Sequence, residues 1–291
     1  ALKRAPSIKG VVLVNHGLFT WGDDTKSAYD QHIHLVTKAE EFISSGKKKV
    51  FGDAWQQPLD SSQRRRTAAA AAPTLRGLVS QNRPMVLRFD DSTEVLEFIG
   101  SEQGQRLSAI GPATPDHLIH TKRKPLWLEM SDPANPQAVS QALRDGITQY
   151  VDEYSQWYRA QISDEHPMLD PYPRVVLLPG VGMWTTGKDA LAAQITADIY
   201  HHTINVIGSA QSVGDYTSLT AQDAYDAEYW PLELYKLTLA PSEKQLARRV
   251  ALVTGAANGI GKAIAWEMSR EGADVAIASR NLEDLEKAAR E

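Results

Sequence analysis

The amino-acid sequence predicts a mixed α/β protein, and two observations lead to that prediction. Short apolar runs bounded by glycine or polar residues are typical of buried strands. The clearest of these runs span 11–14, 175–178, 249–254 and 274–278. A segment with helical spacing of apolar residues follows each run. These segments span 25–43, 189–207, 261–270 and 282–291. Strands that alternate with helices along a chain indicate an α/β architecture.

Composition limits the classes of function. The chain has 291 residues, of which 42% are hydrophobic and 23% charged, and this length predicts two domains or one domain with additional parts. The formal net charge of −5 disfavours a nucleic-acid partner, because neutralising phosphates requires an excess of Lys and Arg. No apolar run reaches the roughly eighteen residues of a membrane span, and no secretory signal pattern is present. The chain has no cysteine for disulfides, metal thiolates or nucleophilic catalysis. We therefore expect a cytoplasmic protein that binds neither membrane nor nucleic acid.

The remaining segments are expected to be partly helical and partly irregular. Residues 46–66 contain charge runs and no periodicity, which predicts a linker or surface excursion. The stretch from 67 to 79 should be helical but interrupted at Pro73. A strand is expected at 85–89 and a long helix at 134–162. Residues 221–246 are rich in Tyr, Glu and Pro and are expected to form a docking tail and a connector.

A glycine-rich loop lies between the apolar run 249–254 and the amphipathic segment 261–270. The loop reads Thr-Gly-Ala-Ala-Asn-Gly-Ile-Gly. In this context one glycine permits a tight turn, one lets the backbone approach a pyrophosphate, and one allows close helix–strand packing. The pyrophosphate then lies at the positive end of the helix. The expected cofactor-binding residues are Thr254, Gly255, Asn258, Gly259, Ile260 and Gly261. The alternative is a purely structural turn.

The spacing Thr-Gly-x-x-x-Gly-x-Gly resembles the short-chain dehydrogenase family, over about residues 247–291. The resemblance implies the first βαβ of a Rossmann domain that binds NAD or NADP. The family's catalytic Tyr-x-x-x-Lys and its Ser would lie outside this chain, so only a cofactor half-site is expected here. After the second strand, NAD-preferring enzymes place an Asp or Glu, whereas this sequence has Ser279 and Arg280. A guanidinium pairs with a 2′-phosphate, which favours NADP over NAD. The alternative is that Arg280 is a solvated turn residue.

A second motif lies near the start of the chain. The segment 14–20 reads Val-Asn-His-Gly-Leu-Phe-Thr and precedes the helical segment 25–43. It resembles the C-terminal part of the class II aldolase/adducin family. That resemblance implies that His16 is one of three zinc-ligand histidines and that zinc polarises the substrate carbonyl. The other two ligands and the catalytic Glu would precede residue 1. A lone histidine is more often structural, and that reading stays open for His16.

The other histidines are expected to have structural positions. His32 and His34 fall within the helical segment 25–43, and His201 and His202 are expected to form a surface pair on a helix. His166 precedes a proline and is expected in a loop.

The sequence contains an internal repeat. A shift of 165 residues aligns 11–28 with 176–193, and seven of the eighteen positions are identical, where about one is expected by chance. The identical positions in the first copy are Val11, Leu13, Gly17, Thr20, Gly22, Asp24 and Ala28. Position His16 becomes Val181 in the second copy, which cannot bind zinc. We therefore expect both strand–helix units to have the same geometry, with His16 facing a cleft and Val181 packed among apolar side chains.

A basic segment lies upstream of the second copy. Residues 116–122 resemble a degenerate His-x-His motif in which Lys122 occupies a ligand position. The triplet Lys122, Arg123 and Lys124 has two possible roles: it is a solvated loop, or its cations meet a substrate phosphate.

Taken in order, these parts resemble the bifunctional class II aldolase/short-chain dehydrogenase proteins of the rhamnulose-1-phosphate aldolase type. The expected domains are the C-terminal part of a class II aldolase/adducin-like domain (1–66), a second, metal-less aldolase-like module (67–240) and a truncated Rossmann segment (247–291). The resemblance implies cleavage of a ketose 1-phosphate with Zn²⁺ and redox of the aldehyde or alcohol with NAD or NADP. It also implies small sugar-phosphate and aldehyde partners and a homo-oligomer.

Two alternatives stay open at this point. The aldolase-like part could be a non-catalytic scaffold beside an active oxidoreductase, or the chain could be a truncation without an independent role. In either case this fragment alone is expected to catalyse neither reaction, because it lacks two zinc ligands and the dehydrogenase Tyr and Lys.

Overall fold

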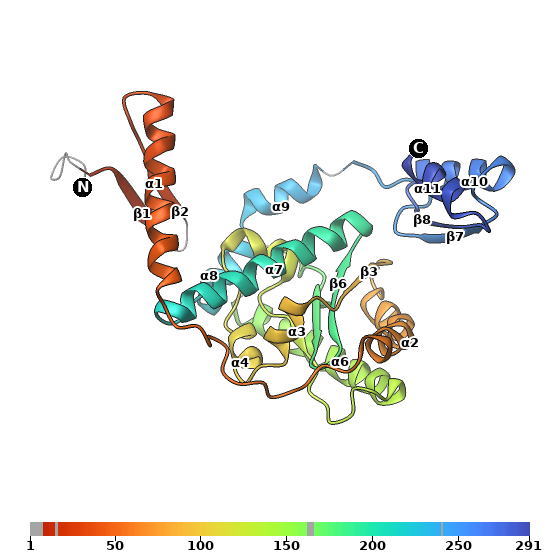
Figure 1. Ribbon diagram of the computed structural model, residues 1–291, viewed down its shortest axis with the longest axis horizontal. Helices are drawn as coiled ribbons and strands as arrows, with labels where there is room; N and C mark the ends of the chain where they lie inside the picture. Colours follow the sequence, from red (N-terminus) through yellow and green to blue (C-terminus); the bar gives the residue numbers. More distant parts are fainter. Residues whose placement is uncertain (1–7, 15–16, 162–165, 240) are drawn as a thin grey trace.

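The computed structural model describes residues 8–14, 17–161, 166–239 and 241–291, which form three parts in chain order (Figure 1). A short hairpin and a long helix come first, a central four-stranded module follows, and a two-stranded unit ends the chain. The strands are β1 (Gly10–Leu13), β2 (Gly17–Thr20), β3 (Val86–Asp90), β4 (Leu126–Trp127), β5 (Val175–Leu178), β6 (Gly182–Gly187), β7 (Val250–Thr254) and β8 (Asp274–Ala278). The expected α/β class is confirmed.

The helices match most of the segments with helical spacing. They are α1 (Thr25–Ser44), α2 (Ser61–Val79), α3 (Thr93–Ile99), α4 (Gly104–Ser108), η2 (Pro115–His117), α5 (Leu118–Thr121), α6 (Pro136–Gln161), α7 (Ala190–Val213), α8 (Ala221–Glu228), α9 (Pro231–Thr238), α10 (Gly259–Arg270) and α11 (Leu282–Arg290). None of the helices in the described ranges is long and apolar enough to cross a membrane.

The central sheet has the order β3-β6-β5-β4 and is covered on both faces. Successive side chains of a strand point to opposite faces, and β5 follows this rule. Val176 and Leu178 belong to an apolar cluster with α2 and α6. Val175 and Leu177 belong to a second cluster with α3 and α7. Every residue of β5 and β6 is buried, which explains why β5 appears in the sequence as an unbroken apolar run.

Helix α2 corrects two expectations about the segment before the sheet. It begins at Ser61, capped by Asp60, so the irregular stretch is shorter than 46–66. It then continues through Pro73 to Val79 without ending there. The buried residues Ala71 and Leu75, one on each side of this proline, pack against α6. Tertiary packing of the helix face therefore outweighs the loss of one backbone hydrogen bond at Pro73.

Helices α8 and α9 replace the tail that was expected at 221–246. Ala224, Tyr225 and Tyr229 are buried in a third apolar cluster with Leu118 and the aromatic residues of α6. Tyr225 and Tyr229 stack with ring centroids 4.7 Å apart. The first half of this segment is thus part of the core of the central module, and only the stretch after α9 acts as a connector.

The internal repeat is a β-hairpin followed by a helix, and its two copies share one strand register. In the first copy Gly10 pairs with Thr20 and Leu13 with Gly17. Adding 165 to each number gives the pairs Val175 with Thr185 and Leu178 with Gly182, and these are the pairs observed in the second copy. Gly17 and Gly182 have nearly the same backbone angle, with φ of 159° and 153°.

The link from hairpin to helix is also the same in both copies. The Thr20 hydroxyl donates to the Ala28 carbonyl (3.0 Å), and the Thr185 hydroxyl donates to the Ala193 carbonyl (2.8 Å). Asp24 and Asp189 both have extended backbones and cap their helices by accepting a backbone N–H three residues on. The expected duplication is therefore confirmed in the strand register, in the backbone at Gly17 and Gly182, and in the helix cap.

The residue at the metal position differs between the copies as expected. Val181 is fully buried among the apolar side chains that lie between the sheet, α2 and α6. His16, the corresponding residue of the first copy, lies outside the described residues.

The close contact between β6 and α7 predicts that two glycine substitutions change the stability of the protein in opposite directions. A Cβ at Gly187 would lie 2.6 Å from the backbone carbonyl carbon of Ala192, so we expect Gly187→Ala to lower the free energy of unfolding by at least about 2 kcal/mol. A Cβ at Gly77, within α2, meets nothing within 4 Å, so Gly77→Ala should raise it by roughly 0.5–1 kcal/mol. Urea unfolding followed by circular dichroism measures both. A Gly187→Ala variant as stable as the wild type would contradict the proposed role of this glycine.

Candidate cofactor site

The glycine loop connects β7 to α10 at the carboxyl end of β7. Gly255 and Gly259 both have left-handed backbones, with φ of 67° and 56°. Only glycine adopts this region without steric cost, which explains two of the three glycines in the motif. Asn258 has an extended backbone and precedes the first turn of α10. The loop therefore turns twice within five residues and presents the N-terminus of a 12-residue helix.

The third glycine allows the helix to approach the loop closely. A Cβ at Gly261 would lie 2.8 Å from the backbone carbonyl carbon of Gly255, so no other residue fits without displacing the loop. The Ala256 N–H donates to the Ala278 carbonyl (3.3 Å), which joins the loop to the end of β8. Thr254, Asn258 and Ile260 are exposed, and Ile260 is 82% exposed. The loop backbone thus packs tightly against α10 and β8, while its outer side is exposed and leaves room for a pyrophosphate at the helix N-terminus.

Ser279 and Arg280 lie beside this loop. Strands β7 and β8 are parallel, and Thr254 pairs with Ala278. The residues that follow each strand therefore emerge at the same edge of the sheet. Both Ser279 and Arg280 are exposed, so the structure brings them to the edge that carries the glycine loop.

The rest of this unit packs on one face of its sheet only. Helix α10 contacts both β7 and β8, and α11 contacts β8. Alternate residues of β7 are exposed, with Val250 at 53% and Leu252 at 70%. Gly272 follows the C-cap residue Glu271 of α10 and has a left-handed backbone, with φ of 93°. Ala256, Trp266 and Ile277 help to line a hollow between α10 and α11.

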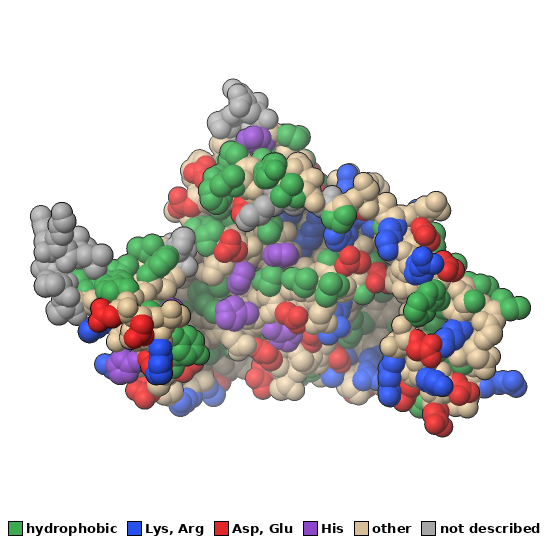
Figure 2. Space-filling model, turned by 90° about the horizontal axis from the view of Figure 1, so that it is seen from above, with side chains coloured by type: hydrophobic (Ala, Val, Ile, Leu, Met, Phe, Trp, Pro, Cys, Tyr) green, Lys and Arg blue, Asp and Glu red, His purple; other side chains and the backbone are tan. Residues whose placement is uncertain are grey.

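The central module has no metal centre in its described residues. Across the described ranges of the chain, no group of three or more His, Cys, Asp or Glu is placed to hold a metal ion. Figure 2 shows several histidine side chains on one face of the molecule, near acidic side chains. The rings of His117 and His202 are close together, with centroids 6.1 Å apart.

His201 is 24% exposed on α7 and forms two ion pairs, which the expectation of a surface pair did not include. Its Nε2 lies 2.9 Å from Asp90 Oδ2 and its Nδ1 lies 3.0 Å from Glu94 Oε2. Partial burial by itself lowers the pKa of His201, but hydrogen bonds to the two carboxylates outweigh it and raise the pKa above its usual value. The residue therefore joins α7 to the end of β3 and to α3.

Lys122 is buried, so the expectation of a solvated loop is wrong for this residue. Its Nζ lies 2.7 Å from Glu228 Oε1 and 3.2 Å from the Tyr154 hydroxyl. Only 5% of the Lys122 side chain and none of the Glu228 side chain is exposed. Burial lowers the pKa of Lys122, and the Glu228 carboxylate opposes that shift. The ammonium is already paired with Glu228, so it is not available to a substrate phosphate.

Sequence reasoning missed this pair because its partners are 106 residues apart. The only signal was a Glu in a Tyr-rich segment that was expected to be a tail. Lys122 also has a left-handed backbone, with φ of 62°, which the sequence did not indicate.

Comparison with known proteins identifies the central module and the C-terminal two-stranded unit. The family model for the second domain of class II aldolases matches residues 66–237, the region of the central sheet and its helices. The chain belongs to the class II aldolase second-domain family. The short-chain dehydrogenase model matches residues 249–291, which contain the glycine loop. The expected combination of an aldolase module with a short-chain dehydrogenase segment is therefore confirmed.

Several individual proteins are similar to the chain. An uncharacterized oxidoreductase, YuxG of Bacillus subtilis, is 38% identical over 289 residues, which cover 98% of this chain and 42% of the relative. A probable 2,4-dienoyl-CoA reductase of Caenorhabditis elegans is 56% identical over 46 residues, 16% of this chain and 15% of the relative. A mitochondrial dehydrogenase/reductase SDR family member 2 of Homo sapiens is 51% identical over 43 residues, 15% of each chain. The chain spans less than half the length of the Bacillus relative.

The His201 ion pairs predict a pH-dependent contribution to stability. A histidine whose folded pKa is raised stabilises the fold fully below its unfolded pKa of about 6.5, and this stabilisation is lost as the pH rises through the folded pKa. The pKa of Asp90 is lowered, since its hydrogen bonds to His201 and Ser92 outweigh burial. Its contribution is therefore lost only in acid, below its unfolded pKa of about 3.9.

We therefore expect His201→Gln to destabilise the protein more at pH 5.5 than at pH 8.5, by about 1 kcal/mol. Urea unfolding at the two pH values measures this difference. His34→Gln, at an exposed position of α1, is the control and should show no such difference. Equal destabilisation of His201→Gln at both pH values would contradict a charged His201.

Proposed function

We propose that this chain is part of a longer two-activity enzyme whose C-terminal activity is an NAD(P)-dependent oxidoreductase. The observation that carries the proposal is the glycine loop 254–261, with its two left-handed glycines and its close contact at Gly261. The short-chain dehydrogenase match and the oxidoreductase relative that covers 98% of this chain support it.

The cofactor, when bound, would supply a nicotinamide that accepts or donates a hydride. The residues of this chain would bind and orient it. Backbone N–H groups at the start of α10 would face the pyrophosphate, where the helix N-terminus favours negative charge. Gly255 and Gly259 would let the backbone approach the phosphates, while Thr254 and Asn258 present polar side chains beside them.

Arg280 would select NADP over NAD. It is exposed directly after β8, at the edge where the adenosine ribose of a dinucleotide lies in this type of fold. A guanidinium forms two parallel hydrogen bonds with a phosphate, and Ser279 adds a hydroxyl beside it. A carboxylate at this place would instead repel the 2′-phosphate.

The second proposed activity is aldol cleavage of a ketose 1-phosphate of the rhamnulose 1-phosphate type, which would yield dihydroxyacetone phosphate and lactaldehyde. The support is the match to a class II aldolase domain and the His-Gly motif of the first repeat copy. The second copy does not fit a zinc ion, because Val181 is buried at the ligand position. Any zinc would therefore depend on His16 and on residues outside this chain.

The main alternative keeps the oxidoreductase and makes the aldolase-like part a scaffold. The buried Val181 favours that role for the second module, and lyase activity would then be absent from the longer protein. With the lyase activity, the proposed substrates are small sugar phosphates and aldehydes or alcohols, and without it they are aldehydes or alcohols alone. In both cases we propose a cytoplasmic location and a homo-oligomer.

Cofactor choice tests the proposed oxidoreductase. In the longer protein we expect Arg280→Asp to shift the ratio of NADP to NAD affinity toward NAD by about tenfold or more, because a charge-assisted contact contributes roughly 1.5–3 kcal/mol. Fluorescence titration with NADPH and NADH measures the ratio. Arg290→Asp, with the same charge change at the exposed end of α11, should leave it unchanged.

Two outcomes would contradict this proposal at different levels. A wild-type protein that strongly prefers NADH would contradict the role of Arg280 alone. A Gly259→Val variant that binds both nucleotides as well as the wild type would contradict the assignment of the loop, since φ of 56° at this position excludes a β-branched residue.

A further inference from the structure

The dehydrogenase segment and the central module are joined by contacts that the proposed function does not require. The connector after α9 packs first against the dehydrogenase segment. The Leu246 N–H donates to the Glu271 carbonyl (2.9 Å), and the Asp274 N–H donates to the Arg249 carbonyl (2.9 Å). A Cβ at Gly272 would lie 3.3 Å from Lys244 Cβ. Residues 244–249 are therefore a fixed part of the dehydrogenase unit.

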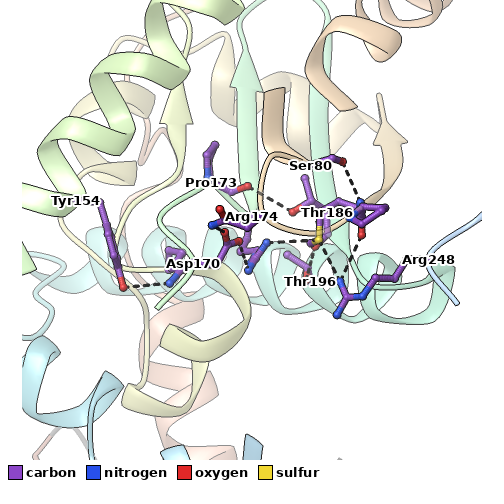
Figure 3. Close-up of polar contacts among 12 residues, drawn as sticks. Ser80, Tyr154, Asp170, Pro173, Arg174, Thr186, Thr196 and Arg248 are labelled. Atoms are coloured by element: carbon purple, nitrogen blue, oxygen red, sulfur yellow. Dashed lines mark hydrogen bonds and ion pairs between the residues drawn. The ribbon is translucent and has the colours of Figure 1, made fainter. Parts of the chain in front are cut away.

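Arg248 extends from this unit into the central module. Its Nη1 donates to the Pro84 carbonyl (3.3 Å) and lies 3.6 Å from Met85 Sδ, as Figure 3 shows beside Arg174. Its own carbonyl accepts a hydrogen bond from Arg76 on α2 (3.5 Å). Arg248 is held in a left-handed backbone, with φ of 65°, and its side chain is only 13% exposed.

A second contact lies at the N-terminus of α7. Both carboxylate oxygens of Asp274 accept a hydrogen bond from the Ala190 N–H, at 3.1 Å each. A carboxylate at a helix N-terminus is favoured by the helix dipole. Asp274 is the first residue of β8, so this contact and that of Arg248, two residues before β7, lie at the same edge of the sheet.

Glu243 holds the Arg248 side chain from within the connector. Glu243 forms an ion pair with Arg248 at 2.7 Å. The hydrogen bond from Arg248 is the main reason that the pKa of Glu243 is lowered. Arg83 and Lys188 of the central module act in the same direction. Glu243 thus feels the charges of both Arg248 and the central module, whereas Asp274 meets the N-terminus of α7.

We propose that Arg248 and Asp274 form a docking contact that fixes the amino-terminal edge of the dehydrogenase sheet to the aldolase-like module. Strands β7 and β8 are parallel, so the docked edge is opposite the edge that carries the glycine loop, Ser279 and Arg280. The aldolase-like module therefore orients the dehydrogenase unit without covering the edge that binds the cofactor. An aldehyde substrate would reach that edge from solvent and not through the docking contact.

The absence of cysteine from the sequence allows a direct test with two spin labels. Asp152→Cys on α6 and Ser269→Cys on α10 place the labels at exposed positions of the two units. In the 291-residue chain, double electron–electron resonance should give one narrow distance distribution. Arg248→Gly with Asp274→Ala should widen it at least about twofold, because domains without a fixed interface move relative to each other.

Two controls separate docking from folding. Arg248→Gly suits the left-handed backbone at this position and removes only the side chain, so the melting of the central module should not change. Arg249→Ala, at the exposed neighbouring arginine, should keep the narrow distribution. A broad distribution in the labelled wild-type background, or a narrow one in the double variant, would overturn the proposal.

Discussion

The architecture of the chain depends on the closure of one buried hairpin onto the start of α7. Strands β5 and β6 are the two inner strands of the central sheet, and all their residues are buried. At the end of β6 the backbone passes so close to Ala192 and Ala193 that no side chain fits at Gly187. The Thr185 hydroxyl and the Asp189 cap then fix the first turn of α7. Both apolar clusters that cover the sheet include residues of this hairpin.

The first repeat copy has the same contacts between hairpin and helix, so a comparison of the two copies shows which residues the fold itself requires. Glycine, threonine and the capping aspartate are retained in both copies, because each satisfies a backbone constraint that the geometry imposes. The position His16 in one copy is Val181 in the other, and there the side chain fills the core. The second module therefore keeps the repeated framework and has a packing residue at the position that corresponds to His16. Its described contacts to the dehydrogenase unit give it a structural role beside that unit.

The sequence predicted the parts of the structure that depend on local pattern. The 165-residue repeat predicted that the two strand–helix units share one geometry, and the glycine spacing predicted a tight turn and a close approach of helix to strand. The sequence did not predict that α2 continues through Pro73, because packing against α6 decides this. It also did not reveal the contacts of Lys122 with Glu228 or of Arg248 with Pro84, whose partners are more than a hundred residues apart. Such long-range pairs leave no period in the sequence.

The central claim is that a dinucleotide binds at the glycine loop of this chain and not at the aldolase-like module. Hydrogen–deuterium exchange of the longer protein, with and without NADP, tests this claim most directly. The account predicts slower exchange at residues 255–262 and 279–281 and no change in β5, β6 or α7. Slower exchange in the hairpin and α7, with none at the glycine loop, would contradict it.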